Sequence, residues 1–172
     1  MRNKIAHGFT LVELIIYIGI FSLIVVGLMS FALSMTIART KTYVGQEVTA
    51  NARVALDIIT QKIHAAQGVN VVGSTFKTDP GVLSLEMADV SKNPTIINLN
   101  ANDGRLQIKE GAASEVFLTS REVQVKNLIF RNLTQNGERE NIWITLTVQY
   151  GDSNTGDYSY SWTGSTTVSV RQ

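Results

Sequence analysis

The stretch that decides the fold is Gly8-Phe9-Thr10-Leu11-Val12-Glu13-Leu14, together with the apolar run that follows it as far as Leu33. From Leu14 to Leu33 the chain has no charged residue and consists mainly of isoleucine, leucine, valine and phenylalanine. A helix of about 20 residues, each rising about 1.5 Å, spans the roughly 30 Å hydrocarbon core of a bilayer. Glu13 lies just inside this apolar block, where desolvating a carboxylate is costly, so its presence suggests a function.

A short basic leader, residues 1–8 with Arg2 and Lys4, precedes the apolar block. A conventional secretory signal peptide has an apolar region of about 7–15 residues and a small-x-small cleavage site. Ala32-Leu33-Ser34 fits such a site, but the apolar run is too long and Glu13 is out of place. A generic signal-anchor helix would keep Arg2 and Lys4 in the cytoplasm. It would leave Glu13, and the glycine that ends the leader, unexplained.

The segment GFTLVEL, from Gly8 to Leu14, closely resembles the site that prepilin peptidases recognise in type IV pilins and type II secretion pseudopilins. The resemblance implies cleavage after Gly8 and N-methylation of the new N-terminal residue, Phe9. It also implies that Glu13 pairs with the amine of a neighbouring subunit and draws each subunit into register in a filament. The implied partners are prepilin peptidase, other pilins or pseudopilins, and the inner membrane.

Small residues collect on one side of the expected membrane helix. At about 100° per residue they fall within an arc of about 140°, and small residues let helices approach closely in lipid. We therefore expect a packing surface for neighbouring subunits in a filament core. The alternative is that glycine and serine are simply common in membrane helices. The residues of this small-residue face are Gly19, Ser22, Gly27, Ser30 and Ser34.

The helix is expected to continue beyond the apolar run, because no proline occurs before Pro80. Apolar residues recur at spacings of three to four, which is typical of an amphipathic helix with one buried face. Gly68 supplies a stop signal, so we predict one helix from Phe9 to Gln67, about 90 Å long. The residues of the apolar face are Val48, Ala52, Ala55, Leu56, Ile59, Ile63 and Ala66.

After Val69 the apolar period changes to two, which predicts β-strands. Asn102-Asp103-Gly104 and Gln135–Glu138 are turn signals, and Gly151–Gly156 reads as a loop. A parity slip between Val125 and Leu128 predicts a bulge near Lys126-Asn127. The expected strands are Val82–Met87, Thr95–Leu99, Leu106 to Ile108, Glu115–Leu118, Val123–Leu133, Ile142–Tyr150, and a final hairpin of Tyr158–Trp162 and Thr166–Val170.

The predicted fold class is α+β, a long N-terminal helix packed on an antiparallel sheet. We expect a leader at 1–8, a transmembrane helix at 9–33, its amphipathic continuation at 34–67 and a β-rich head at 68–172. The head resembles, more loosely, minor pilins and the J-type minor pseudopilins of type II secretion. The segments that carry this second resemblance are Arg53–Ile59, Val123–Phe130 and Thr166–Arg171.

Composition argues against several other functions. The formal net charge of +1 falls to −1 without Arg2 and Lys4, so we expect no nucleic-acid partner, and the chain has no cysteine. No catalytic set or ligand cluster is evident, and His64 lies on the polar helix face, so we expect no enzyme, cofactor or metal. Calcium held by oxygen atoms of Asx-rich turns is the remaining option. The alternative is that asparagine and aspartate occur in these turns for backbone reasons alone. Those turns contain Asn98, Asn100, Asn102 and Asp103, and Asp152, Asn154 and Asp157.

Tyr158, Tyr160, Trp162 and Trp143 alternate along the last strands and suggest an aromatic ladder used for packing. The expected function is that of a structural filament subunit, a single-pass protein of the inner membrane with its head outside the cytoplasm. A membrane-anchored binding or adhesive protein that never polymerises is the alternative, and a secreted soluble domain is a third. Pilus, type II secretion and competence systems all share this subunit plan.

Overall fold

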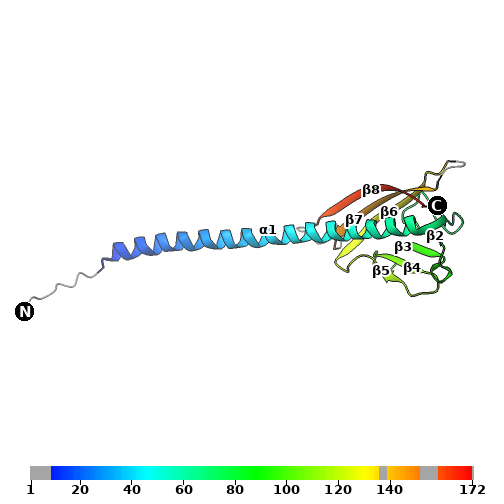
Figure 1. Ribbon diagram of the computed structural model, residues 1–172. Coiled ribbons are helices and arrows are strands. Elements are labelled where there is room, and N and C mark those ends of the chain that lie inside the picture. Colours follow the sequence, from blue (N-terminus) through cyan, green and yellow to red (C-terminus); the bar gives the residue numbers. More distant parts are fainter. Residues whose placement is uncertain (1–8, 136–138, 152–158, 172) are drawn as a thin grey trace, which may run out of the picture. The chain divides into compact units, whose positions relative to one another are not determined.

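The computed structural model describes residues 9–135, 139–151 and 159–171 of the 172-residue chain. By its internal contacts the chain divides into two compact units, Met1–Lys41 and Thr42–Gln172. Helix α1 and the strands are drawn in Figure 1. The elements are α1 (Leu11–Ala65), β1 (Ala66–Val69), β2 (Leu83–Met87), a 3-10 turn (Val90–Lys92), β3 (Thr95–Leu99), β4 (Leu106–Glu110), β5 (Val116–Phe117), β6 (Val123–Asn132), β7 (Asn141–Tyr150) and β8 (Ser161–Ser169).

The long helix predicted from the sequence is present as α1, which is two residues shorter at each end than the predicted Phe9–Gln67. Its end is set by strand pairing, because Ala66 is already extended and lies opposite Met87 of β2. Ala66 is 1% exposed, so the apolar face of the helix runs directly into the first strand. Strand β1 was not predicted, since its sequence, Ala66–Val69, still fits the helical period.

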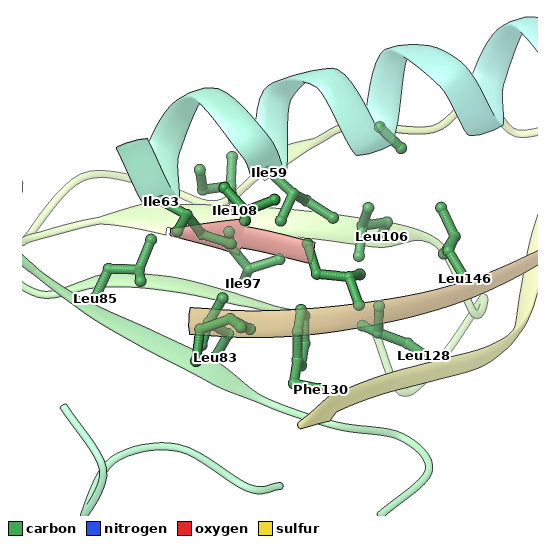
Figure 2. Packing of buried hydrophobic residues seen from close by; sticks show 14 of the residues in the cluster. Ile59, Ile63, Leu83, Leu85, Ile97, Leu106, Ile108, Leu128, Phe130 and Leu146 are labelled. Carbon is green, nitrogen blue, oxygen red and sulfur yellow. The ribbon is translucent and has the colours of Figure 1, made fainter. Parts of the chain in front are cut away.

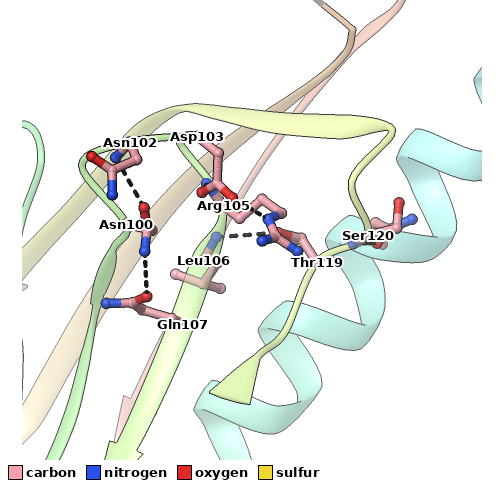
Figure 3. A network of polar contacts seen from close by, with 9 residues as sticks. Asn100, Asn102, Asp103, Arg105, Leu106, Gln107, Thr119 and Ser120 are labelled. Atoms are coloured by element: carbon pink, nitrogen blue, oxygen red, sulfur yellow. Dashed lines mark hydrogen bonds and ion pairs between the residues drawn. The ribbon is translucent and has the colours of Figure 1, made fainter. Parts of the chain in front are cut away.

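The strands form two antiparallel sheets where the sequence predicted one. The first has the order β1-β2-β3-β4-β5 and the second the order β6-β7-β8. The break follows β5, where the chain turns from the sheet to the helix. Leu106 N donates to Thr119 Oγ1, and Ser120 N then donates to Asn51 Oδ1 of α1 at 2.8 Å. The bond from Leu106 to Thr119 can be followed in Figure 3, and the two bonds mark where the chain leaves the first sheet for the helix.

Most strands of the head lie where the alternation of apolar residues places them. Strand β3 has the predicted bounds, and the burial along β7 alternates from Ile142 to Val148. The register between β6 and β7 shifts between Val125 and Asn127, which confirms the predicted bulge. The predicted turn at Gln135–Glu138 and the loop at Gly151–Gly156 fall largely outside the described residues.

The predicted final hairpin is wrong. Ser161 and Trp162 of the first predicted half and most of the second half belong to one strand, β8, which pairs with β7 from Ser161 to Ser169 without a break in register. Gly164 lies between the two predicted halves. In the structure this glycine makes room for the Trp162 indole, whose Cη2 would lie 2.1 Å from a Cβ at that position. An aromatic ring that covers a strand glycine compensates for its missing side chain.

The hydrophobic core lies between the second half of α1 and the inner faces of both sheets. Figure 2 shows Ile59 and Ile63 of the helix pointing toward Ile97, Leu106 and other apolar side chains of the sheets. The helix residues with the least exposure are those of the predicted apolar face, with Val44 added and Leu56 only partly buried. The amphipathic pattern therefore identified the buried face of the helix.

Candidate functional site at the start of the long helix

The first turn of α1 is closed by a reciprocal set of hydrogen bonds between Thr10 and Glu13. The backbone N–H of Thr10 donates to Glu13 Oε2 at 3.0 Å, and its hydroxyl donates to the same oxygen at 2.9 Å. The backbone N–H of Glu13 donates in return to Thr10 Oγ1 at 3.3 Å. This is a capping box, with Thr10 at the N-cap and Glu13 three residues on. It satisfies donors that the start of a helix leaves without an intrahelical partner.

The sequence analysis assigned Glu13 a role but missed Thr10. The signal was available, because a serine or threonine followed three residues later by an acidic residue, just before an apolar run, marks a capping box. The consequence is that one oxygen of Glu13, Oε2, is already occupied within its own chain. Within the described part of the chain, no hydrogen bond to the other oxygen, Oε1, is found.

Phe9 stands beside this capping box and is 77% exposed. Its ring makes an edge-to-face contact with Tyr17, two turns along the helix, with the ring centroids 5.9 Å apart. Gly8, the predicted cleavage residue, lies outside the described residues. The structure thus describes one side of the predicted cleavage bond.

The apolar residues after Glu13 form a continuous exposed surface. The most apolar 18-residue window of α1 has a mean hydropathy of 2.6, and none of it is buried by the other residues that the structure describes. By length and composition this helix is sufficient to cross a membrane. A soluble helix with this much exposed apolar area would be unusual, because monomeric soluble proteins rarely expose large contiguous apolar patches.

The small-residue face is open in the structure. A Cβ at Gly19 or Gly27 would have no atom within 4 Å. The Ser22 hydroxyl donates to Gly19 O at 2.8 Å, and the Ser34 hydroxyl donates to Ser30 O at 2.9 Å. These hydroxyls are therefore satisfied within the helix, which suits a position in lipid, where an unpaired polar group is costly.

The other candidates from the sequence are used locally or lie apart from this segment. Both carboxylate oxygens of Asp103 bond Arg105, Oδ2 to its Nε at 2.6 Å and Oδ1 to its backbone N–H (Figure 3). Desolvation by itself raises the pKa of Asp103. The hydrogen bonds from Arg105 and its positive charge outweigh this effect, so the pKa of Asp103 lies below its usual value. His64 is exposed and lines a pocket of about 380 Å³ with Arg139 and Arg171.

The remaining Asx-rich turn and part of the predicted aromatic ladder cannot be placed in this way. Asp152, Asn154, Asp157 and Tyr158 lie outside the described residues. The two tryptophans do not form a ladder, because Trp143 alternates with the buried residues of β7 whereas Trp162 packs against the core. Trp143 instead contacts the Arg131 guanidinium, which lies 4.6 Å from the centre of its ring.

Comparison with known protein families gives one finding, and it falls on this segment. The family described as the prokaryotic N-terminal methylation motif matches residues 3–29. No curated protein and no solved structure matches the chain significantly. The match covers residues 3–8 of the leader, the capping box and most of the apolar run, and the described remainder of the chain has the helix-on-sheet architecture that the resemblance implies. The chain therefore carries a prokaryotic N-terminal methylation motif, consistent with the type IV pilin-like family, on an α+β fold in which a long helix packs on antiparallel sheets.

Proposed function

We propose that the protein is a minor pilin or pseudopilin, a structural subunit that prepilin peptidase processes and that assembles into a filament. The filament would be a type IV pilus or the pseudopilus of a type II secretion system. The observation that carries the proposal is the coincidence of the methylation motif at residues 3–29 with an apolar segment of α1 that no described part of the protein buries. A helix of this kind requires lipid or other helices around it.

In this proposal the chain has four regions with different surroundings. The leader, residues 1–8, lies in the cytoplasm, and its Arg2 and Lys4 agree with the positive-inside rule. The segment 9–33 anchors the precursor in the inner membrane. The amphipathic continuation, 34–67, and the head, 68–172, lie outside the cytoplasm, where the buried face of α1 completes the core of the head.

The capping geometry suggests how Glu13 would act after processing. Cleavage after Gly8 turns the backbone nitrogen of Phe9 into an amine, which remains cationic when it is methylated. Oε2 of Glu13 stays in the capping box of its own chain, and Oε1 is left to accept a hydrogen bond from such an amine. In lipid, a carboxylate without a compensating charge is strongly disfavoured. The amine of a neighbouring subunit would compensate it and set the register between the two helices.

The small-residue face would serve the same assembly. Gly19 and Gly27 offer open space, and the serines bond their own helix, so another apolar helix can approach closely without leaving polar groups unpaired. This role fits the filament core better than an isolated anchor, because a lone anchor needs no close helix contacts.

The processing step is tested by Gly8→Val, with Ala6→Val as the matched control within the same leader. Because the peptidase must approach the backbone at the cleavage bond, we expect Gly8→Val to keep its leader and to be absent from sheared filaments. Ala6→Val should be processed and assembled normally. The measurement is the gel mobility of the protein in membrane and filament fractions. Mature-sized protein from Gly8→Val would rule out the prepilin assignment.

A further inference from the structure

Strand β8 forms an edge of the three-stranded sheet, and its backbone pattern shows which groups point outward. Val170 N donates to Glu140 O at 2.9 Å, and Tyr150 N donates to Tyr160 O at 3.0 Å. In an antiparallel pair such hydrogen-bonded positions alternate with positions whose N–H and C=O point away from the partner. The unbroken register then fixes the outward-pointing residues as Ser161, Thr163, Ser165, Thr167 and Ser169. Within the described residues, none of them has a backbone partner on that side.

The opposite edge of the same sheet is closed. Lys77 N donates to Phe130 O at 2.8 Å, and Gly81 N donates to Leu128 O at 2.7 Å. Leu128 N in turn donates to Asp79 Oδ1 at 3.0 Å. The loop before β2 therefore occupies the outer side of β6. The two outer strands of the first sheet, β1 and β5, are short, with four and two residues. Among the described strands, β8 is thus the long edge that remains open (Figure 1).

Within the described part of the chain, this edge has none of the usual protections against pairing. Proteins normally block open edges with charged residues, proline, bulges or very short strands. Strand β8 has nine residues, no charge and no proline, and its register with β7 has no bulge. All the outward-pointing residues are serine or threonine, small side chains that do not hinder the approach of another backbone. An unprotected edge of this length indicates that it is used for binding.

We propose that β8 is the docking site for an extended strand of a different polypeptide, which adds a fourth strand to the β6-β7-β8 sheet. N–H and C=O groups at every second residue are matched by another extended backbone and by no small ligand. The preferred strand is uncharged. On the outer face of the sheet it has small or β-branched residues beside the serines and threonines of β8. On the core face its residues are apolar, because there they lie beside the half-buried Trp162.

A second copy of this chain is the less suitable occupant. Pairing of β8 with β8 of a second copy is an isologous contact, which closes into a two-fold dimer, whereas the subunits of a filament contact one another through two different surfaces. The choice of a different polypeptide therefore rests on the proposed function. The open edge itself does not, since it follows from the hydrogen bonds of the head alone.

The test uses the full-length protein in detergent micelles and a fluorescent nine-residue peptide in which threonine and valine alternate. We expect saturable binding by fluorescence anisotropy, and loss of binding when alternate peptide amides are N-methylated. Ser165→Pro removes the outward N–H at the centre of the edge and should weaken binding about tenfold. The control is Thr145→Lys, because a proline at this position would disrupt the inner strand β7. Thr145 lies beside Ser165 on the same outer face, and the control variant should bind the peptide as the wild type does.

Two results would overturn the proposal. The first is peptide binding that is absent or indifferent to N-methylation of the peptide, a comparison that uses only the wild-type protein and so does not depend on the folding of Ser165→Pro. The second is a dimer held through β8. Because the chain has no cysteine, Ser165→Cys reports this directly as a symmetric disulfide, with Thr145→Cys as its control. Normal leader cleavage alongside either result would leave the proposed filament function intact.

Discussion

Replacing Glu13 with glutamine separates the capping box from the assembly role that we propose for this side chain. The structure shows the capping box with Thr10, and the proposed role is charge compensation with the amine of a neighbour. Glutamine keeps an oxygen that can accept the Thr10 N–H, so it preserves the capping box. It removes the negative charge. Thr10→Ala does the reverse, since it removes the capping hydroxyl and leaves the carboxylate in place.

The two variants should differ in the size of their effects. Loss of an N-cap threonine costs about 1 kcal/mol, which changes the population of the helical first turn about fivefold. Thr10→Ala should therefore accelerate hydrogen exchange at the Glu13 amide by about that factor and lower filament assembly only moderately. Thr10→Ser keeps the hydroxyl and serves as its control. Glu13→Gln should exchange normally but assemble at about a tenth of the wild-type level or less, because the amine of the neighbour loses its partner.

Assembly is measured as the ratio of the protein in sheared filaments to the protein in membranes. Hydrogen exchange at the Glu13 amide is measured separately, on the protein in detergent. Both variants should insert in the membrane and be cleaved, since neither changes the leader. Full assembly of Glu13→Gln together with failure of Thr10→Ala would refute the reasoning. Glu13 would then serve to start the helix, and its charge would have no part in assembly.

Two further predictions concern the head, in a soluble fragment that starts at Arg39. Ile59→Ala should lower the free energy of unfolding by about 2–5 kcal/mol in urea titrations, because Ile59 is fully buried. Val54 is exposed on the same helix, and Val54→Ala should change the free energy of unfolding by less than about 0.5 kcal/mol. Equal effects of the two substitutions would show that the face with Ile59 is not the packed one. The Tyr43 hydroxyl donates to Glu122, and this bond raises the pKa of Tyr43, so its stabilisation is present below the unfolded pKa of about 10 and is lost as pH rises through the folded pKa. Glu122→Gln should therefore shift the titration of the Tyr43 phenol, followed by ultraviolet absorbance, to lower pH. An unchanged titration would contradict the contact.

The sequence was most informative where one period persists over many residues. The apolar run and the face that includes Ile59 and Ile63 predicted α1 and its buried side, because both patterns repeat over several turns. Alternation along β7 and the parity slip near Lys126 predicted a strand and a bulge for the same reason. The prediction of one sheet failed, since the chain leaves the first sheet after β5, where Ser120 bonds Asn51 of the helix, a long-range contact that no local pattern reveals.

The failure at β8 has a similar cause. Gly164 lies between the two predicted strands, but the space beside it is filled by an indole from the same strand, a contact that is only visible once the strand is formed. The candidate site was more predictable, because its motif is local. Glu13 was identified by its unexpected charge, and Thr10 could have been identified by its spacing from Glu13. The edge of β8 could not, since an open edge is defined by what the other strands leave uncovered.

The most direct test of the central claim is the intact mass of the protein extracted from cells that contain the filament machinery. Cleavage after Gly8 and methylation of Phe9 predict a chain of residues 9–172 that carries one additional methyl group. A chain that begins at Met1 would show that the segment is only an anchor. One that begins near Met35 would show that it is an ordinary signal peptide. Either result would contradict the assignment of this protein as a processed filament subunit.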